Sequence, residues 1–159
     1  MPRTFKLWLP VVLWMAIIFI VSTDFGSATH TSQIIEPLLR WFNPNISPGA
    51  IDLVQTLVRK GGHFTEYAIL ALLAFRATYG SPQNLRAGNY YRAAGIALLI
   101  AAGYAASDEF HQSFVPSRTA SIFDVLIDTC GAFTALAIAV LWRKFVRNPT
   151  SARAAQTTP

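Results

Sequence analysis

The sequence predicts an all-α membrane protein, a bundle of four transmembrane helices with both termini in the cytoplasm. With 53% hydrophobic and 13% charged residues over 159 positions, and a mean hydropathy of +0.38, the chain is too apolar for an ordinary soluble domain. It also contains four apolar segments that approach the length an α-helix needs to cross a bilayer. These candidate spans are residues 7–21, 53–79, 93–110 and 122–142.

The first candidate span has some features of a signal peptide. Arg3 and Lys6 precede an apolar run, and small residues follow it. The run nevertheless contains two tryptophans and a proline, and no clear Ala-x-Ala cleavage site comes after it. We therefore expect this segment to be retained as a membrane anchor.

The second candidate span is the least regular of the four. It carries Arg59, Lys60, His63 and Glu66 before its apolar part, residues 68–75, begins. Charged side chains in lipid are costly, so the first turns of this helix are expected to face protein or lipid headgroups.

Two segments outside the candidate spans carry weaker signals. Residues 25–50 contain three prolines and are expected to form a loop. Within them, residues 34–42 with Trp41 and Phe42 suit a segment that lies at the membrane interface and covers a site, although an ordinary solvated loop with one hydrophobic anchor is favoured. Residues 1–147 are expected to form one helical membrane domain, and residues 148–159 a disordered tail.

The distribution of basic residues gives the orientation. With four spans, nine of the thirteen lysines and arginines fall on the side of the two termini, together with no acid. The opposite side receives all eight acids and four basic residues, namely Arg40, Arg59, Lys60 and Arg118. This bias places both termini in the cytoplasm of a multi-pass protein of the inner (cytoplasmic) membrane. It also accounts for the net charge of +5, so no nucleic-acid partner is expected.

Polar residues concentrate between the third and fourth candidate spans. Residues 108–118 combine acids, His111, Gln112 and Arg118, and Ser121, Asp124 and Asp128 follow. A charged residue near the centre of a membrane helix costs roughly 2.5–3.5 kcal/mol, so such a group is by default a candidate functional site. The alternative is a polar turn that lies wholly among the headgroups.

In the four-span topology, the start of the second span meets this polar region at the outer face. Helical spacing puts Arg59, His63 and Glu66 at i, i+4 and i+7, and Lys60, His63 and Tyr67 also share a face. Asp108, His111 and Gln112 share a face of the third span, as do Asp124 and Asp128 of the fourth. Gly61 and Gly62 are expected to let a neighbouring helix or a ligand approach closely. A structural network of ion pairs that sets helix register would need the same residues.

Two stretches of this region resemble the VanZ-like family of small bacterial integral membrane proteins, which is named after an accessory factor associated with teicoplanin resistance. They read R-K-G-G-H-F-T-E-Y-A-I-L over residues 59–70 and S-D-E-F-H-Q-S-F-V-P-S-R-T-A-S-I-F-D-V-L-I-D-T-C-G over residues 107–131. The resemblance covers residues 53–140 and implies a membrane protein that bears on the cell envelope, without an established reaction. The chain departs from the family pattern at Ser117, where glycine is usual, and at Asp128, where asparagine is frequent.

The motif residues carried over from the family, position by position, are Lys60, His63, Glu66, Asp108, Glu109, Gln112, Pro116, Arg118, Ser121 and Asp124. All of these except Pro116 are the candidate substrate-binding residues. The cations Lys60 and Arg118 suit a phosphate, and Gln112 and the acids suit hydroxyl or amine donors. These properties favour binding or handling of an envelope lipid or cell-wall precursor headgroup, with a membrane lipid, a lipid-linked molecule or a glycopeptide as partner. The resemblance connects this function with glycopeptide (teicoplanin) resistance.

Two other classes of function stay open. A membrane-embedded hydrolase or transferase would use His63 or His111 with an orienting carboxylate, although no nucleophile signature accompanies Ser113 or Ser121. A small transporter is the other class. The spacing H-x-x-E differs from the H-E-x-x-H of zinc proteases, and no metal or other cofactor is expected.

Overall fold

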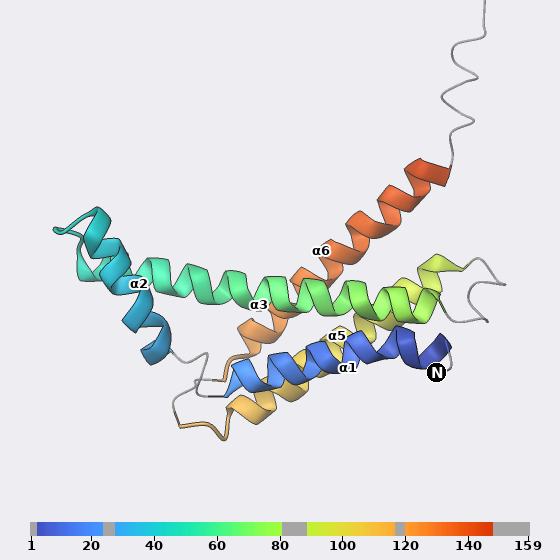
Figure 1. Ribbon diagram of the computed structural model, residues 1–159, viewed down its shortest axis with the longest axis horizontal. Helices are drawn as coiled ribbons and strands as arrows, with labels where there is room; N and C mark the ends of the chain where they lie inside the picture. The colour runs from blue at the N-terminus through green and yellow to red at the C-terminus, as the bar shows by residue number, and fades with distance from the viewer. Residues whose placement is uncertain (1–2, 24–27, 81–88, 117–119, 148–159) are drawn as a thin grey trace, which may run out of the picture.

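The structure, a computed structural model, describes residues 3–23, 28–80, 89–116 and 120–147 (Figure 1). Within these residues the chain is all-helical, as the sequence predicts, and contains no strand. The expected disordered tail, residues 148–159, lies outside them. The helices are α1 (Arg3–Ser22), α2 (Ala28–Phe42), α3 (Pro48–Tyr79), α5 (Tyr90–Gln112) and α6 (Ile122–Arg147).

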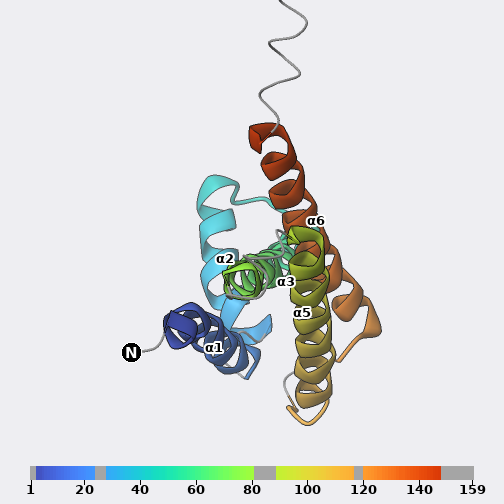
Figure 2. The ribbon, with the colours of Figure 1, turned by 90° about the vertical axis from the view of Figure 1, so that its right-hand side faces the viewer.

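The four long helices alternate in direction. In Figure 1, α1 and α5 run one way along the molecule and α3 runs the other, while α6 crosses α3 obliquely in the same general sense as α3. The start of α1, the end of α3, the start of α5 and the end of α6 therefore lie toward one end. Figure 2, turned by 90°, shows α3 between α1 on one side and α5 and α6 on the other.

Three of the four predicted spans are confirmed as helices that are long and apolar enough to cross a membrane. They are Arg3–Ser22, Tyr90–Gln112 and Ile122–Lys144. The remaining helix, α3, has 32 residues and a length of about 48 Å, more than the hydrocarbon core of about 30 Å. Its first half, which carries α2 beside it, projects beyond the other helices in Figure 1.

The prediction of a loop over residues 25–50 is wrong for most of residues 28–50, and residues 25–27 lie outside the described residues. Ala28–Phe42 form α2, with Pro37 inside the helix, and α3 already begins at Pro48. Ile34, Leu38 and Trp41 recur at helical spacing and form an apolar stripe, which the three prolines obscure in the sequence. These three side chains are exposed, Trp41 by 76%, as an interface-lying segment requires.

The core of the bundle is built from small side chains. Ala93, Ala97, Ala101 and Ala105 follow one another at every fourth position of α5, and all four are fully buried. Small residues let helix backbones approach closely, which is how helices associate where lipid removes the hydrophobic driving force. The alanine stripe of α5 therefore fits it for close packing inside a membrane.

Two hydrogen bonds hold α1 on this core. The indole nitrogen Nε1 of Trp14 donates to the carbonyl oxygen of Glu66 over 2.9 Å, and the hydroxyl of Tyr104 donates to the carbonyl oxygen of Met15 over 2.7 Å. They connect α1 to α3 and α5 respectively, so the first helix is part of the bundle.

At Gly131 the backbones of α6 and α3 approach too closely to admit a side chain. A Cβ atom on Gly131 of α6 would overlap the carbonyl oxygen of Phe64 in α3 and would lie 2.9 Å from its carbonyl carbon. By contrast, no described atom lies within 4 Å of a Cβ built on Gly61 or Gly62. The expectation of a close approach at Gly61 and Gly62 is therefore wrong for the helices. The crossing of α3 and α6 makes that contact at Gly131 instead.

Candidate functional site

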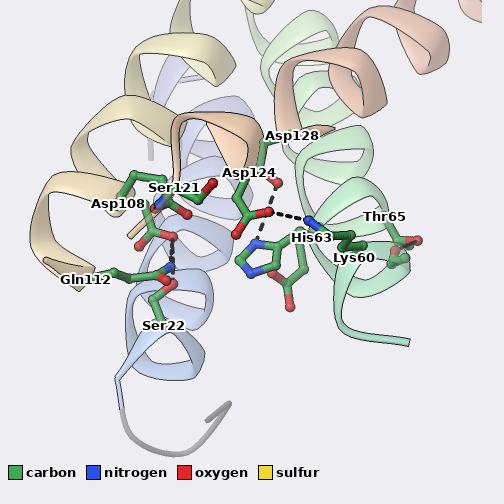
Figure 3. A network of polar contacts seen from close by, with 12 residues as sticks. Ser22, Lys60, His63, Thr65, Asp108, Gln112, Ser121, Asp124 and Asp128 are labelled. Carbon is green, nitrogen blue, oxygen red and sulfur yellow. Dashed lines mark hydrogen bonds and ion pairs between the residues drawn. The ribbon is translucent and has the colours of Figure 1, made fainter. Parts of the chain in front are cut away.

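The polar residues of four helices meet in one region, called the polar cluster from here on (Figure 3). The middle of α3, the end of α5, the start of α6 and the end of α1 contribute to it. Its members are Ser22, Lys60, His63, Glu66, Tyr67, Asp108, Glu109, Gln112, Ser121, Asp124 and Asp128. The meeting of α3 with the end of α5 and the start of α6 is the one that the four-helix topology predicts, and the end of α1 joins them through Ser22.

Two acid–base pairs connect α3 to α6, one helical turn apart. The ammonium nitrogen of Lys60 lies 2.8 Å from Oδ1 of Asp124, with the two side chains 37% and 14% exposed. One turn further into the bundle, Nδ1 of His63 lies 3.5 Å from Oδ1 of Asp128. Asp128 is fully buried. The two pairs line up because their residues lie three or four positions apart on a common face of each helix.

Asp108 ties the end of α1 to α5. Its Oδ2 accepts a hydrogen bond from the hydroxyl of Ser22 over 2.7 Å and one from Nε2 of Gln112 over 2.9 Å. All three side chains are buried. The Gln112 bond spans one helical turn of α5, the i to i+4 relation predicted for this face.

Glu109 fixes the entry into α6. Its Oε2 accepts a hydrogen bond from the backbone N–H of Ser121 over 2.7 Å. An acidic group at the start of a helix interacts favourably with the unpaired N–H groups there. The hydroxyl of Ser121 in turn accepts from the N–H of Phe123, so this serine acts as a local cap.

The cluster contains more acids than bases. Four other carboxylates lie within electrostatic reach of Asp128, namely Glu66, Asp108, Glu109 and Asp124. The cluster as defined therefore contains five carboxyl groups and one ammonium, that of Lys60. Buried charges normally occur in pairs or with a bound partner, because desolvation of an isolated charge is costly.

Several buried polar atoms of the cluster have no hydrogen-bond partner among the described residues. They are Oδ1 of Asp108, both carboxylate oxygens of Asp128 and the hydroxyl oxygen of Tyr67. Nearly all buried polar groups in proteins are satisfied by protein or by ordered water. These atoms therefore offer hydrogen-bonding positions to water or to a ligand.

Eight of the nine candidate binding residues of the sequence analysis are described, and all eight belong to the polar cluster. The ninth, Arg118, lies outside the described residues. Glu66 is half-buried, and Arg59, which precedes Lys60 on α3, is exposed. Their role in binding stays a prediction.

Three members of the cluster are absent from that set of nine. Ser22 is the first polar residue after the apolar run of α1, a signal that the sequence offered. Tyr67 and Asp128 stand on the predicted faces of α3 and α6, and both are fully buried. Within the described ranges, no group of three or more His, Cys, Asp or Glu side chains is arranged to hold a metal ion.

Comparison with known proteins gives one result. The model of the family described as VanZ/LLP1 matches residues 7–143. No curated protein matches the chain, and no solved structure matches it. The match spans α1 and the whole polar cluster and covers most of the sequence. The chain therefore belongs to the VanZ/LLP1 family.

Proposed function

We propose that this protein binds or handles the headgroup of an envelope lipid or cell-wall precursor at the polar cluster, on the outer side of the inner membrane. The observation that carries the proposal is the set of buried oxygen atoms, Oδ1 of Asp108 and both Oδ atoms of Asp128, that accept no hydrogen bond from a described residue, although Oδ1 of Asp128 lies 3.5 Å from His63. A ligand rich in hydroxyl or amine donors complements five carboxylates better than a purely anionic one does. Sugar and amino groups of such a headgroup have this chemistry.

The role of the cations is narrower than the sequence suggests. Lys60 is engaged by Asp124 at 2.8 Å, so it contacts a phosphate only by sharing or leaving that ion pair. Arg118, the other candidate phosphate donor, follows α5 within the same connection as Ser121. We therefore assign sugar or amine recognition to the acids and Gln112, and phosphate recognition to Arg118.

The outer location depends on a four-span topology with cytoplasmic termini. The alternating directions of α1, α3, α5 and α6 support it, as does the excess of basic residues on the side of the termini. Reporter fusions after Arg147 and within residues 80–88 should read cytoplasmic, and a fusion near Pro116 should read extracytoplasmic. A cytoplasmic signal at Pro116 would overturn both the span count and the outer placement of the cluster.

The binding proposal is tested by identifying the lipids that co-purify with the protein in mild detergent, by mass spectrometry. A hydrogen bond to a charged acceptor contributes about 1.5–3 kcal/mol, so Asp128→Asn should lower retention of the specific lipid about tenfold or more. The matched control is Asp52→Asn, which changes an exposed aspartate of the same helix bundle and should leave retention unchanged.

Three results would contradict the proposal. One is retention no different from the bulk lipid composition in the wild type. Another is equal loss in Asp128→Asn and Asp52→Asn. The third is loss in Arg118→Ala without loss in Asp128→Asn, which would put recognition on the phosphate alone.

One observation favours a second function, an acid–base hydrolase or transferase. The imidazole of His63 lies 3.5 Å from the carboxylate of Asp128, the kind of pairing by which an acid orients a catalytic histidine. Chemical turnover of the retained lipid on incubation, lost in His63→Gln, would identify an enzyme. Movement of the lipid or a solute across liposomes without chemical change would identify a transporter.

A further inference from the structure

A groove opens between α3 and α6 at the end of the bundle opposite the polar cluster. It has a volume of about 490 Å³, within the range of about 300–1,000 Å³ that is usual for ligand pockets. The oblique crossing of the two helices lets it form there (Figure 1). Its lining residues are Leu72, Phe75, Ala135, Ile138, Ala139, Trp142 and Arg143.

The lining changes character along the groove. Toward the middle of the bundle it is entirely apolar, with Leu72 from α3 facing Ala135 and Ile138 from α6. At the helix ends it finishes in Trp142 and Arg143. Trp142 is 70% exposed, and tryptophan is enriched where a membrane helix reaches the interface. The groove is therefore apolar toward the middle of the bundle and carries a cation at the end where the helices finish.

The guanidinium group of Arg143 is held in place by two aromatic rings. Its central carbon lies 4.3 Å from the ring centroid of Tyr79 and 5.6 Å from that of Phe75. Stacking on a ring face restrains the plane of the guanidinium while its N–H groups point outward from the edge. Arg76, exposed on α3 one turn after Leu72, adds a second cation on the same side.

This end of the bundle is strongly basic. The described acids lie elsewhere, in α2, in α3 no further along than Glu66, at the end of α5 and at the start of α6. The described basic residues at this end are Arg3, Lys6, Arg76, Arg92, Arg143 and Lys144. A second copy of this chain would bring the same positive charges against its own, which disfavours it as the occupant of the groove.

From these contacts we infer that the α3–α6 groove binds an anionic phospholipid, with an acyl chain along Leu72, Ala135 and Ile138 and the phosphate on Arg143. The planar guanidinium matches phosphate oxygens in a bidentate manner. The site is separate from the polar cluster and does not depend on the proposed function. A second groove, between α5 and α6, has about 240 Å³ and no charged lining residue, so it lacks the headgroup donor.

The experiment uses the full chain in nanodiscs that contain phosphatidylcholine and phosphatidylglycerol in equal amounts, with retained lipids read by native mass spectrometry. Wild type should retain phosphatidylglycerol preferentially. Arg143→Gln should reduce this preference about fivefold, the effect of one basic residue at an anionic membrane surface. The control Lys144→Gln removes the same charge from the next position, which is exposed and outside the groove, and should leave the preference unchanged.

A second variant tests the apolar part without a change in charge. Ala135→Leu narrows the groove and should reduce retention of the bound lipid while Arg143 is intact. Equal loss in Arg143→Gln and Lys144→Gln would reduce the effect to diffuse surface charge and overturn the site. Equal retention of the two lipids by wild type would also overturn it. So would a dimer of this chain that dissociates in Ala135→Leu, because the groove would then bind a second copy.

Discussion

Replacement of Gly131 by alanine is expected to lower the free energy of unfolding by at least about 3 kcal/mol, the upper range for overpacked cores. The added Cβ would overlap the carbonyl oxygen of Phe64, and backbone atoms cannot rotate out of the way as a side chain can. The variant can accommodate the methyl group only if α3 and α6 separate. That separation would also lengthen the two acid–base pairs that connect these helices in the polar cluster. Thermal unfolding in detergent and the amount of folded protein in membranes measure the effect.

Gly103→Ala is the matched control. Gly103 is exposed on α5, and no described atom lies within 4 Å of a Cβ built there. Alanine is favoured over glycine inside a helix by about 0.5–1 kcal/mol, so this change should be neutral or stabilising. If Gly131→Ala behaved like Gly103→Ala, the close crossing of α3 and α6 would be contradicted.

Replacement of Lys60 by methionine is expected to destabilise the protein more than replacement of its partner, Asp124, by asparagine. Loss of Lys60 leaves Asp124 without its ion-pair partner and removes the one ammonium from a cluster of five carboxyl groups, so repulsion among those groups is less compensated. Loss of the Asp124 charge instead removes one carboxylate from a cluster that contains more acids than bases. Since the pair is only partly buried, we expect about 2 kcal/mol for Lys60→Met, between the values for exposed and buried ion pairs.

A double-mutant cycle with chemical or thermal unfolding measures this asymmetry. The double variant Lys60→Met with Asp124→Asn should recover part of the stability lost in Lys60→Met, because it removes the unpaired carboxylate. Arg59→Met is the control, since Arg59 precedes Lys60 on α3 but is exposed and should contribute little. Equal effects of Lys60→Met and Asp124→Asn would mean that the surplus of acids around Asp128 does not influence stability.

The polar cluster illustrates how far periodicity alone can predict a site. Spacing predicts that Lys60, His63 and Tyr67 share a helix face, and the burial of His63 and Tyr67 confirms that face. The i to i+4 relation of Asp108 and Gln112 is likewise confirmed by their hydrogen bond. Such predictions succeed because a helix places every third or fourth side chain on the same side, whatever surrounds it.

In residues 25–50 the prolines predict a loop where the structure has a helix. Pro37 favours a loop in the sequence, yet it lies within α2, where Ile34, Leu38 and Trp41 keep helical spacing. A proline inside a helix forfeits one hydrogen bond and strains the preceding turn. In α2 the chain is helical in spite of Pro37. The apolar stripe and the Glu36–Arg40 ion pair, at 2.9 Å, both have the spacing that a helix brings together.

What the sequence determined by itself is local: the helical class, the apolar lengths of α1, α5 and α6, the bias of basic residues and the faces that carry the polar side chains. Each depends on composition or on the geometry of a single helix. Tertiary structure alone decided which faces meet. It paired Lys60 with Asp124 across 64 residues, brought Ser22 to Asp108 across 86, and made Gly131 rather than Gly61 or Gly62 the point of contact. Those outcomes depend on the direction and height at which helices cross. Interlocking side chains along the whole interface determine that crossing, so it cannot be predicted from any one helix.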